Sequence, residues 1–114
     1  MRRLALGIAY CLLASGCATG GRGGGGEVTE YEGVYRHDFE VESFRPCGSP
    51  EQWWVANPDV IHARYREQVG GTPGTVFVVM RGELSDPGRY GHMGRYRRMI
   101  SVSEVTRIEP RDTC

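Results

Sequence analysis

Residues 31–43 constrain the fold most strongly, because their side chains alternate between two faces along the whole segment. The more apolar face carries Tyr31, Gly33, Tyr35, His37, Phe39 and Val41, and the polar face carries Glu32, Arg36, Asp38, Glu40 and Glu42. A period of two is typical of a β-strand that is buried on one face. A flat hairpin needs less length, so we expect a long first strand that bends around a small barrel, with Gly33 at the kink.

A helix is predicted between residues 58 and 69. Asn57 suits the N-cap position, and Pro58 suits the first helical position. Ile61, Tyr65 and Val69 then recur at intervals of four with polar residues between them, which indicates one apolar face. Two glycines follow and predict the end of the helix. We expect this one-sided helix to close one end of the barrel.

Three further segments are predicted to be strands. Segment 51–56 contains Trp53 and Trp54, which point to opposite faces of a strand, so one of them enters the core. Segment 75–84 is apolar on both faces and should be a central strand. In segment 95–108 the alternation of the apolar residues changes partway along, which predicts one bulged strand or two short ones. The order strand, strand, helix, strand, strand, with a first strand long enough to count twice, predicts a mainly β protein with one helix. Its architecture is a small OB-fold-like Greek-key barrel.

The N-terminal residues have the organisation of a secretory signal. Arg2 and Arg3 precede an apolar run of about ten residues, which is half of the roughly 20 that a membrane-spanning helix needs. Small residues then lead into Cys17, and this pattern resembles the lipobox of bacterial lipoproteins, whose cysteine is acylated and becomes the new N-terminus. An ordinary secreted protein cleaved near Ala18 is the alternative. The expected organisation is a signal peptide at 1–16, a lipidated cysteine with a glycine-rich tether at 17–30, and an OB-like domain at 31–114.

Cysteine positions add a second expectation. Of the four cysteines, Cys11 leaves with the signal peptide and Cys17 carries the lipid, so Cys47 and Cys114 remain. In an exported protein, two remaining thiols most simply form one disulfide. Closing a loop of this length contributes roughly 4 kcal/mol before native strain is subtracted. The alternatives are two free thiols and a bond from Cys114 to another molecule.

The charge balance argues against nucleic-acid binding. The chain has 14 basic and 14 acidic residues, whereas nucleic-acid-binding domains usually carry a basic excess. Arginines nevertheless alternate with tyrosines in segment 89–98, as they do on some ligand-binding surfaces. The candidate binding surface consists of Trp53, Trp54, Arg89, His92, Arg95 and Arg97. The alternative is a solvated face on which the arginines pair with carboxylates such as Glu40 and Glu42.

No metal or cofactor site is predicted. Imidazole and thioether groups suit copper, and the chain contains three histidines and four methionines. However, His92 lies in a glycine-rich loop, His37 in a core-facing row and His62 on a helix, so their spacing does not gather them. No motif combines a nucleophile with a base and an orienting group, and we expect no catalytic activity.

Several short motifs occur in a characteristic order. They are Gly33-x-Tyr35, Phe44-x-x-Cys47, Ala63-Arg64-Tyr65, and Pro73-Gly74 before a valine-rich strand. Together they resemble the C-terminal OB domain of the NlpE-type envelope-stress and copper-homeostasis lipoproteins, over most of residues 31–114. The resemblance implies a disulfide near the end of the domain, between Cys47 and Cys114. The N-terminal CxxC barrel of that family has no counterpart here, so redox or copper sensing is not implied.

These observations predict a function at the cell envelope. We expect a lipid-tethered binding or sensing module that contacts an envelope protein, a glycan or a lipid headgroup. Ala18 differs from the aspartate that retains lipoproteins in the inner membrane of enteric bacteria, so the resemblance favours the outer membrane, facing the periplasm. A structural envelope lipoprotein without a small ligand and a periplasmic copper-binding protein are the alternatives.

Overall fold

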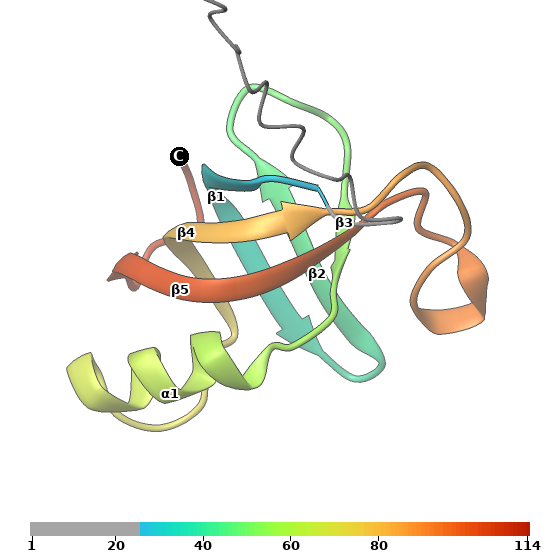
Figure 1. Ribbon diagram of the computed structural model, residues 1–114. Helices are drawn as coiled ribbons and strands as arrows, with labels where there is room; N and C mark the ends of the chain where they lie inside the picture. Colours follow the sequence, from blue (N-terminus) through green and yellow to red (C-terminus); the bar gives the residue numbers. More distant parts are fainter. Residues whose placement is uncertain (1–25) are drawn as a thin grey trace, which may run out of the picture.

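The computed structural model describes residues 26–114, which form a closed five-stranded barrel with one α-helix (Figure 1). The elements are β1 (Val28–Asp38), β2 (Val41–Pro46), β3 (Trp53–Val55), α1 (Asp59–Gln68), β4 (Thr75–Leu84), the short 3₁₀ helix η1 (His92–Gly94) and β5 (Met99–Glu109). The predicted signal peptide, the lipidated Cys17 and most of the tether lie outside these residues. Residues 28–30, which were expected to belong to the tether, are the first residues of β1.

The strands follow each other around the barrel in the order β1-β2-β3-β5-β4, and β4 closes the ring by pairing with β1. All neighbouring strands are antiparallel except β3 and β5, which pair in parallel. The helix lies between β3 and β4 in the chain and packs against β5. The predicted fold class, a mainly β OB-fold-like barrel with one helix, is confirmed.

The alternating segment 31–43, which was expected to be a single strand, is a tight hairpin, because β1 ends at Asp38 and the chain turns back into β2. Strands β1 and β2 are joined by Phe39 and Glu40, and Glu40 adopts a left-handed backbone conformation with φ of 56°. The backbone N–H of Phe39 donates to the carboxylate of Asp38, which fixes the turn. Because the turn reverses the parity of the core-facing positions, Phe39 is 83% exposed, whereas Phe44 is buried. The expected core position of Phe39 is therefore corrected.

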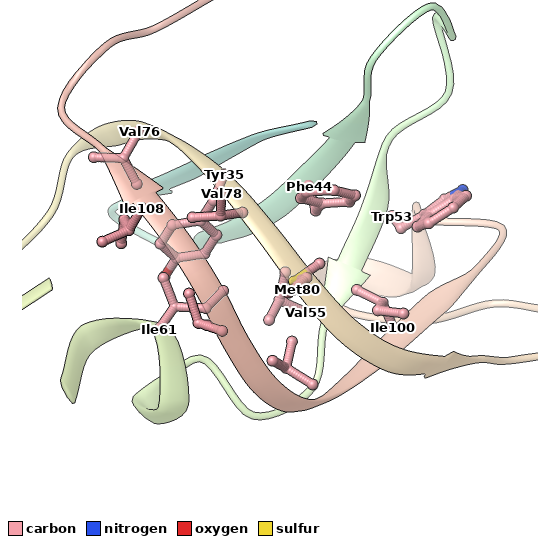
Figure 2. Close-up of a cluster of buried hydrophobic side chains, with 12 residues drawn as sticks. Tyr35, Phe44, Trp53, Val55, Ile61, Val76, Val78, Met80, Ile100 and Ile108 are labelled. Carbon is pink, nitrogen blue, oxygen red and sulfur yellow. The ribbon is translucent and has the colours of Figure 1, made fainter. Parts of the chain in front are cut away.

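The core fills the interior of the barrel with side chains from every strand and from the helix (Figure 2). Its fully buried members include Tyr35, Phe44, Ile61, Val78, Met80 and Ile100. Each fully buried apolar side chain of this size contributes about 1.5–3 kcal/mol. Gly33 is needed where β1 passes close to β2, because a Cβ atom there would lie 2.2 Å from the carbonyl oxygen of Arg45.

Asn57 connects the start of the helix to β5 and does not act as its N-cap. The backbone N–H of Val102 donates to Oδ1 of Asn57 over 2.6 Å, and Nδ2 of Asn57 donates to the carbonyl of Val102. Because its side chain is hydrogen-bonded to β5, Asn57 does not cap the helix. Pro58 occupies the N-cap position without a side-chain hydrogen bond. The predicted position of Pro58 inside the helix is shifted by one residue.

The last strand is bulged, as the change in the alternation of its apolar residues predicted. The register between β4 and β5 shifts between Val79 and Met80 and again between Arg81 and Gly82, so β5 is one bulged strand. It begins at Met99, which leaves residues 95–98 in the preceding loop. This boundary lengthens the β4–β5 loop, defined from here on as residues 85–98.

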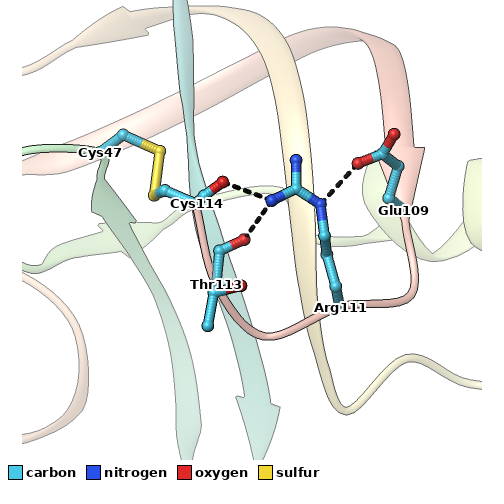
Figure 3. Close-up of a disulfide and its surroundings, with 5 residues drawn as sticks. All are labelled: Cys47, Glu109, Arg111, Thr113 and Cys114. Carbon is cyan, nitrogen blue, oxygen red and sulfur yellow. Dashed lines mark hydrogen bonds and ion pairs between the residues drawn. A yellow bond between two sulfur atoms is a disulfide. The ribbon is translucent and has the colours of Figure 1, made fainter.

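The disulfide between Cys47 and Cys114 is present and ties the chain end to the segment after β2 (Figure 3). Arg111 holds the intervening tail by donating to the carboxylate of Glu109 over 2.6 Å and to the carbonyl oxygens of Thr113 and Cys114. Its guanidinium also lies over the ring of Phe77 at 4.0 Å. The predicted disulfide pairing is confirmed.

Candidate functional site

The β4–β5 loop projects beyond the barrel and carries most of the candidate binding residues (Figure 1). Reciprocal backbone hydrogen bonds between Tyr90 and Tyr96 close the loop on itself. The hydroxyl of Tyr90 donates to the carbonyl of Asp86, which closes a second, smaller ring. The loop is thus a folded projection held by its own hydrogen bonds.

The two tryptophans take different roles. Trp53 is 6% exposed and packs edge-on against Tyr31 and obliquely against Phe44 in the core. Trp54 points to the other face, as expected for a neighbouring strand position, and lies half-buried under the loop. Its ring is 5.4 Å from that of Tyr96, and Gly91 packs so closely on it that a Cβ atom would be 2.4 Å away. Trp53 therefore belongs to the core and not to the candidate surface, and Trp54 is the support on which the loop rests.

Three arginines of the loop have no acidic partner in the described part of the chain. Arg89, Arg95 and Arg97 are exposed, and within residues 26–114 no carboxylate lies within ion-pair distance of them. The carboxylates expected to pair with them are engaged elsewhere: Glu40 with His92 at 3.1 Å, and Glu42 with His37. The expectation of a mutually neutralised charge face is therefore wrong for these three arginines.

The ion pair between Glu40 and His92 brings the β1–β2 turn to the β4–β5 loop. Each partner has an exposed apolar neighbour: Phe39 beside Glu40, and Met93, 72% exposed, beside His92. The chain also enters the barrel close to the start of this loop, since Val28 pairs with Glu83 at the end of β4. The same end of the domain therefore carries the three loop arginines, exposed apolar side chains and the connection to the N-terminal segment.

A separate polar cluster lies between the hairpin and the helix. His37 and Glu42 are direct partners in the β1–β2 register, with Nδ1 of His37 2.5 Å from Oε1 of Glu42. The buried Tyr35 donates from its hydroxyl to Oε2 of Glu42, and its hydroxyl oxygen is 2.8 Å from Nε2 of His62 on α1. The rings of His37 and His62 meet edge-on at 4.6 Å. We call Tyr35, His37, Glu42 and His62 the polar cluster.

Burial and neighbouring charge set the protonation of two members of the polar cluster. Burial, together with the nearby His37, lowers the pKa of His62, so its ring is neutral at neutral pH. Burial and the hydrogen bond to Glu42 raise the pKa of Tyr35 far above its ordinary value, so its hydroxyl keeps its proton.

The spacing of His37 and His62 in the sequence does not predict their contact. Their meeting depends on the turn at Phe39 and Glu40, which places Glu42 opposite His37, and on the docking of α1 against the barrel. The available signal was Phe44, which is apolar at an even position although the apolar face of residues 31–43 lies at odd positions. A two-residue turn produces such a reversal in the strand that follows it. His92 lies elsewhere, in contact with Glu40.

A hollow of about 270 Å³ lies on the outside of β1 and β2. It is lined mainly by polar side chains, among them Arg36, Arg45 and Asp112. It contains none of the predicted site residues. Within residues 26–114, no helix combines the length and the apolar character that crossing a bilayer requires.

No known protein family matches the chain, and no curated protein or solved structure is significantly similar to it.

Proposed function

We propose that this protein is a lipid-anchored binding module of the bacterial cell envelope, without catalytic activity, whose β4–β5 loop binds anionic, phosphate-bearing headgroups at the membrane surface. The anchor is the acylated Cys17 that the lipobox-like sequence predicts. The observation that carries the proposal is the set of three exposed arginines, Arg89, Arg95 and Arg97, without an acidic partner in the described residues.

Charge and geometry favour a membrane surface as the ligand. Guanidinium groups pair well with phosphate oxygens, because their donors form a planar fork. Basic side chains near an anionic membrane contribute about 1 kcal/mol each. The neighbouring Met93 and Phe39 are exposed apolar side chains that suit the boundary between headgroups and acyl chains.

The position of the chain entry supports the same orientation. Gly26 lies against Leu84, the residue that precedes the loop. A tether that ends at this point holds the β4–β5 loop on the side of the domain that faces the anchor. The acyl chains of a lipoprotein cysteine hold the protein at the membrane by themselves, and the loop arginines add an electrostatic contact with the surface that orients the domain.

Vesicle binding tests the role of the loop. The mature chain from residue 18, exported with an ordinary cleavable signal so that it carries no acyl chain, is mixed with vesicles of phosphatidylcholine alone or with equal parts of phosphatidylglycerol. We expect binding only to the anionic vesicles. Replacing Arg89, Arg95 and Arg97 together by Gln should reduce the partition coefficient about a hundredfold, from three contacts of about 1 kcal/mol each.

A matched variant makes the result specific. Arg45, Arg66 and Arg81 are also exposed and have no ion pair within residues 26–114, so their replacement by Gln changes the net charge by the same amount elsewhere on the surface. Equal losses in the two triple variants, or no preference for anionic vesicles, would contradict the proposal. Cross-linking of the loop to an envelope protein without vesicle binding would identify a protein partner instead.

Mass spectrometry tests the anchor. The N-terminal peptide of protein isolated from its host envelope should begin at Cys17 and carry fatty acyl groups. A peptide that begins near Ala18, or an unmodified Cys17, would contradict the lipoprotein assignment and leave the vesicle result as the only basis for membrane contact.

A further inference from the structure

We infer that His37, Glu42 and His62 form a binding site for a divalent transition-metal ion of the zinc type. The donors are one imidazole nitrogen from each of His37 and His62 and a carboxylate oxygen of Glu42, and these atoms all lie within 4.8 Å of one another. The nitrogens that face the cluster are Nδ1 of His37, beside Glu42, and Nε2 of His62, beside the Tyr35 hydroxyl. Two imidazole nitrogens and one carboxylate oxygen are ligands that Zn²⁺ commonly uses in proteins. This site is independent of the β4–β5 loop and of the membrane role proposed above.

The three donors lie on three ordered elements, β1, β2 and α1. His37 and Glu42 are opposite each other in the β1–β2 register, so their side chains share one face of the sheet. His62 follows Ile61, which is fully buried in the core and fixes the first turn of α1. In Figure 1 the β1–β2 turn lies beside the start of this helix. Donors held on packed elements are positioned more accurately than donors on a free loop.

The spacing of the donors suits a tetrahedral ion. Zinc bonds of about 2.0–2.1 Å place neighbouring ligand atoms roughly 3.4 Å apart. The donor atoms here are separated by 2.5 Å between His37 and Glu42 and by no more than 4.8 Å overall. Zinc binding would therefore lengthen the contact between His37 and Glu42 and shorten the longest donor separation, each by no more than about 1.5 Å. Three protein ligands leave a fourth position for water or another small ligand.

Tyr35 supplies the supporting contact that metal sites commonly have. Its buried hydroxyl donates to Oε2 of Glu42 and leaves Oε1 for the ion. Hydrogen bonds of this kind orient a ligating carboxylate and influence metal affinity. Tyr35 is thus a positioning residue and not a ligand in this arrangement.

The same side chains also satisfy each other by hydrogen bonding, and the two arrangements differ in which ring nitrogens carry protons. In the hydrogen-bonded arrangement, His37 donates from Nδ1 to Glu42, and His62 donates from Nε2 to the hydroxyl oxygen of Tyr35. A metal ion needs both of these nitrogens unprotonated. Metal binding therefore predicts the loss of the proton from Nδ1 of His37 and from Nε2 of His62.

Metal binding would join the hairpin to the helix. Cys47 follows the far end of β2, where the disulfide ties the chain end to the barrel, so the ion and the disulfide would act at opposite ends of that strand. An ion that binds only the folded state stabilises it by mass action. At saturating Zn²⁺ we expect the thermal midpoint to rise by about 5 °C.

The test measures Zn²⁺ uptake by the full chain carrying Cys11→Ser and Cys17→Ser, so that no free thiol competes for the metal. Equilibrium dialysis should show one Zn²⁺ per chain. Nitrogen-detected NMR of the imidazole rings should show Nδ1 of His37 and Nε2 of His62 losing their protons on Zn²⁺ addition, with His92 unchanged. Glu42→Gln and His62→Gln should each weaken binding at least tenfold.

His92→Gln is the matched control, because it removes the only other histidine of the chain from a position outside the cluster. It should leave Zn²⁺ affinity unchanged. Failure of the wild-type chain to take up Zn²⁺, or a loss of uptake in His92→Gln with retention in Glu42→Gln and His62→Gln, overturns the inference. Far-ultraviolet circular dichroism confirms that each variant is folded, and the NMR result on the unmutated rings stands even if a variant fails to fold.

Discussion

Asn57 pairs through its side-chain amide with both backbone polar groups of Val102, as a neighbouring strand would. The contact continues the parallel pairing of β3 with β5 just past the end of β3, since the N–H of Ala56 already donates to the carbonyl of Ile100. It therefore fixes where the chain leaves the sheet and turns into α1. A single polar side chain thus determines how the helix is joined to the barrel.

Replacing Asn57 by Ala should destabilise the domain. The substitution leaves the N–H and carbonyl of the buried Val102 without these partners, which costs about 1–3 kcal/mol. Urea denaturation of the wild type and the variant measures the difference in the free energy of unfolding. Asn57→Asp keeps the acceptor for the Val102 N–H but sets a carboxylate oxygen against the Val102 carbonyl, so it should also be less stable than the wild type. An unchanged urea midpoint in Asn57→Ala would show that the pair contributes nothing.

Reduction of the disulfide should lower stability much more. Cys47 and Cys114 are separated by 67 positions, and the chain-entropy relation gives about 4 kcal/mol for a loop of that size. Urea unfolding with and without a reducing agent should show this loss, and Cys47→Ser should reproduce it. The Cys47→Ser variant should not respond to the reducing agent. Equal stabilities of the oxidised and reduced wild type would contradict the prediction.

Gly33 and Gly74 form a contrasting pair for a third prediction. A Cβ atom at Gly33 would lie 2.2 Å from the Arg45 carbonyl and 2.8 Å from the Phe44 ring, whereas a Cβ atom at Gly74 meets nothing within 4 Å. Gly33→Ala must push β1 and β2 apart and should cost about 1–3 kcal/mol. Gly74→Ala should cost nothing measurable. Similar urea midpoints for the two variants would show that the hairpin absorbs the added methyl group.

The fold was predictable because its signals are local. The alternation before Phe39, the apolar run of β4, the glycines after α1 and the parity shift in β5 each report on their own segment. The turn at Phe39 and Glu40 was less evident, because neither residue belongs to the Gly and Asn types that usually mark a left-handed turn position. Without that turn the register of His37 with Glu42 could not be derived.

The candidate site was predictable only where it lies within one loop. Arg89, Arg95 and Arg97 are close in sequence, so the spacing of residue types is enough to group them. The polar cluster joins a strand pair to a helix that follows later in the chain, and the burial of Trp53 rather than Trp54 depends on the register with β2. These contacts depend on how distant segments pack against each other. The spacing of residue types in the sequence does not reveal that packing.

Acid should abolish the contribution of Glu109 to holding the C-terminal tail. The guanidinium groups of Arg107 and Arg111 hold the pKa of Glu109 below its ordinary value, because their hydrogen bonds favour the carboxylate. A carboxyl group whose pKa is lowered by folding stabilises the folded state above its unfolded pKa, and this stabilisation is lost as the pH falls through the folded value.

Glu109→Gln should therefore unfold at a lower urea concentration than the wild type at neutral pH. Because the variant has no carboxylate to protonate, the two urea midpoints should converge as the pH falls below the lowered pKa of Glu109. The carboxylate is accessible to solvent, so the difference at neutral pH should be small and should shrink with added salt. A gap of the same size at neutral and acid pH would assign the effect to packing of the tail and not to the charge of Glu109.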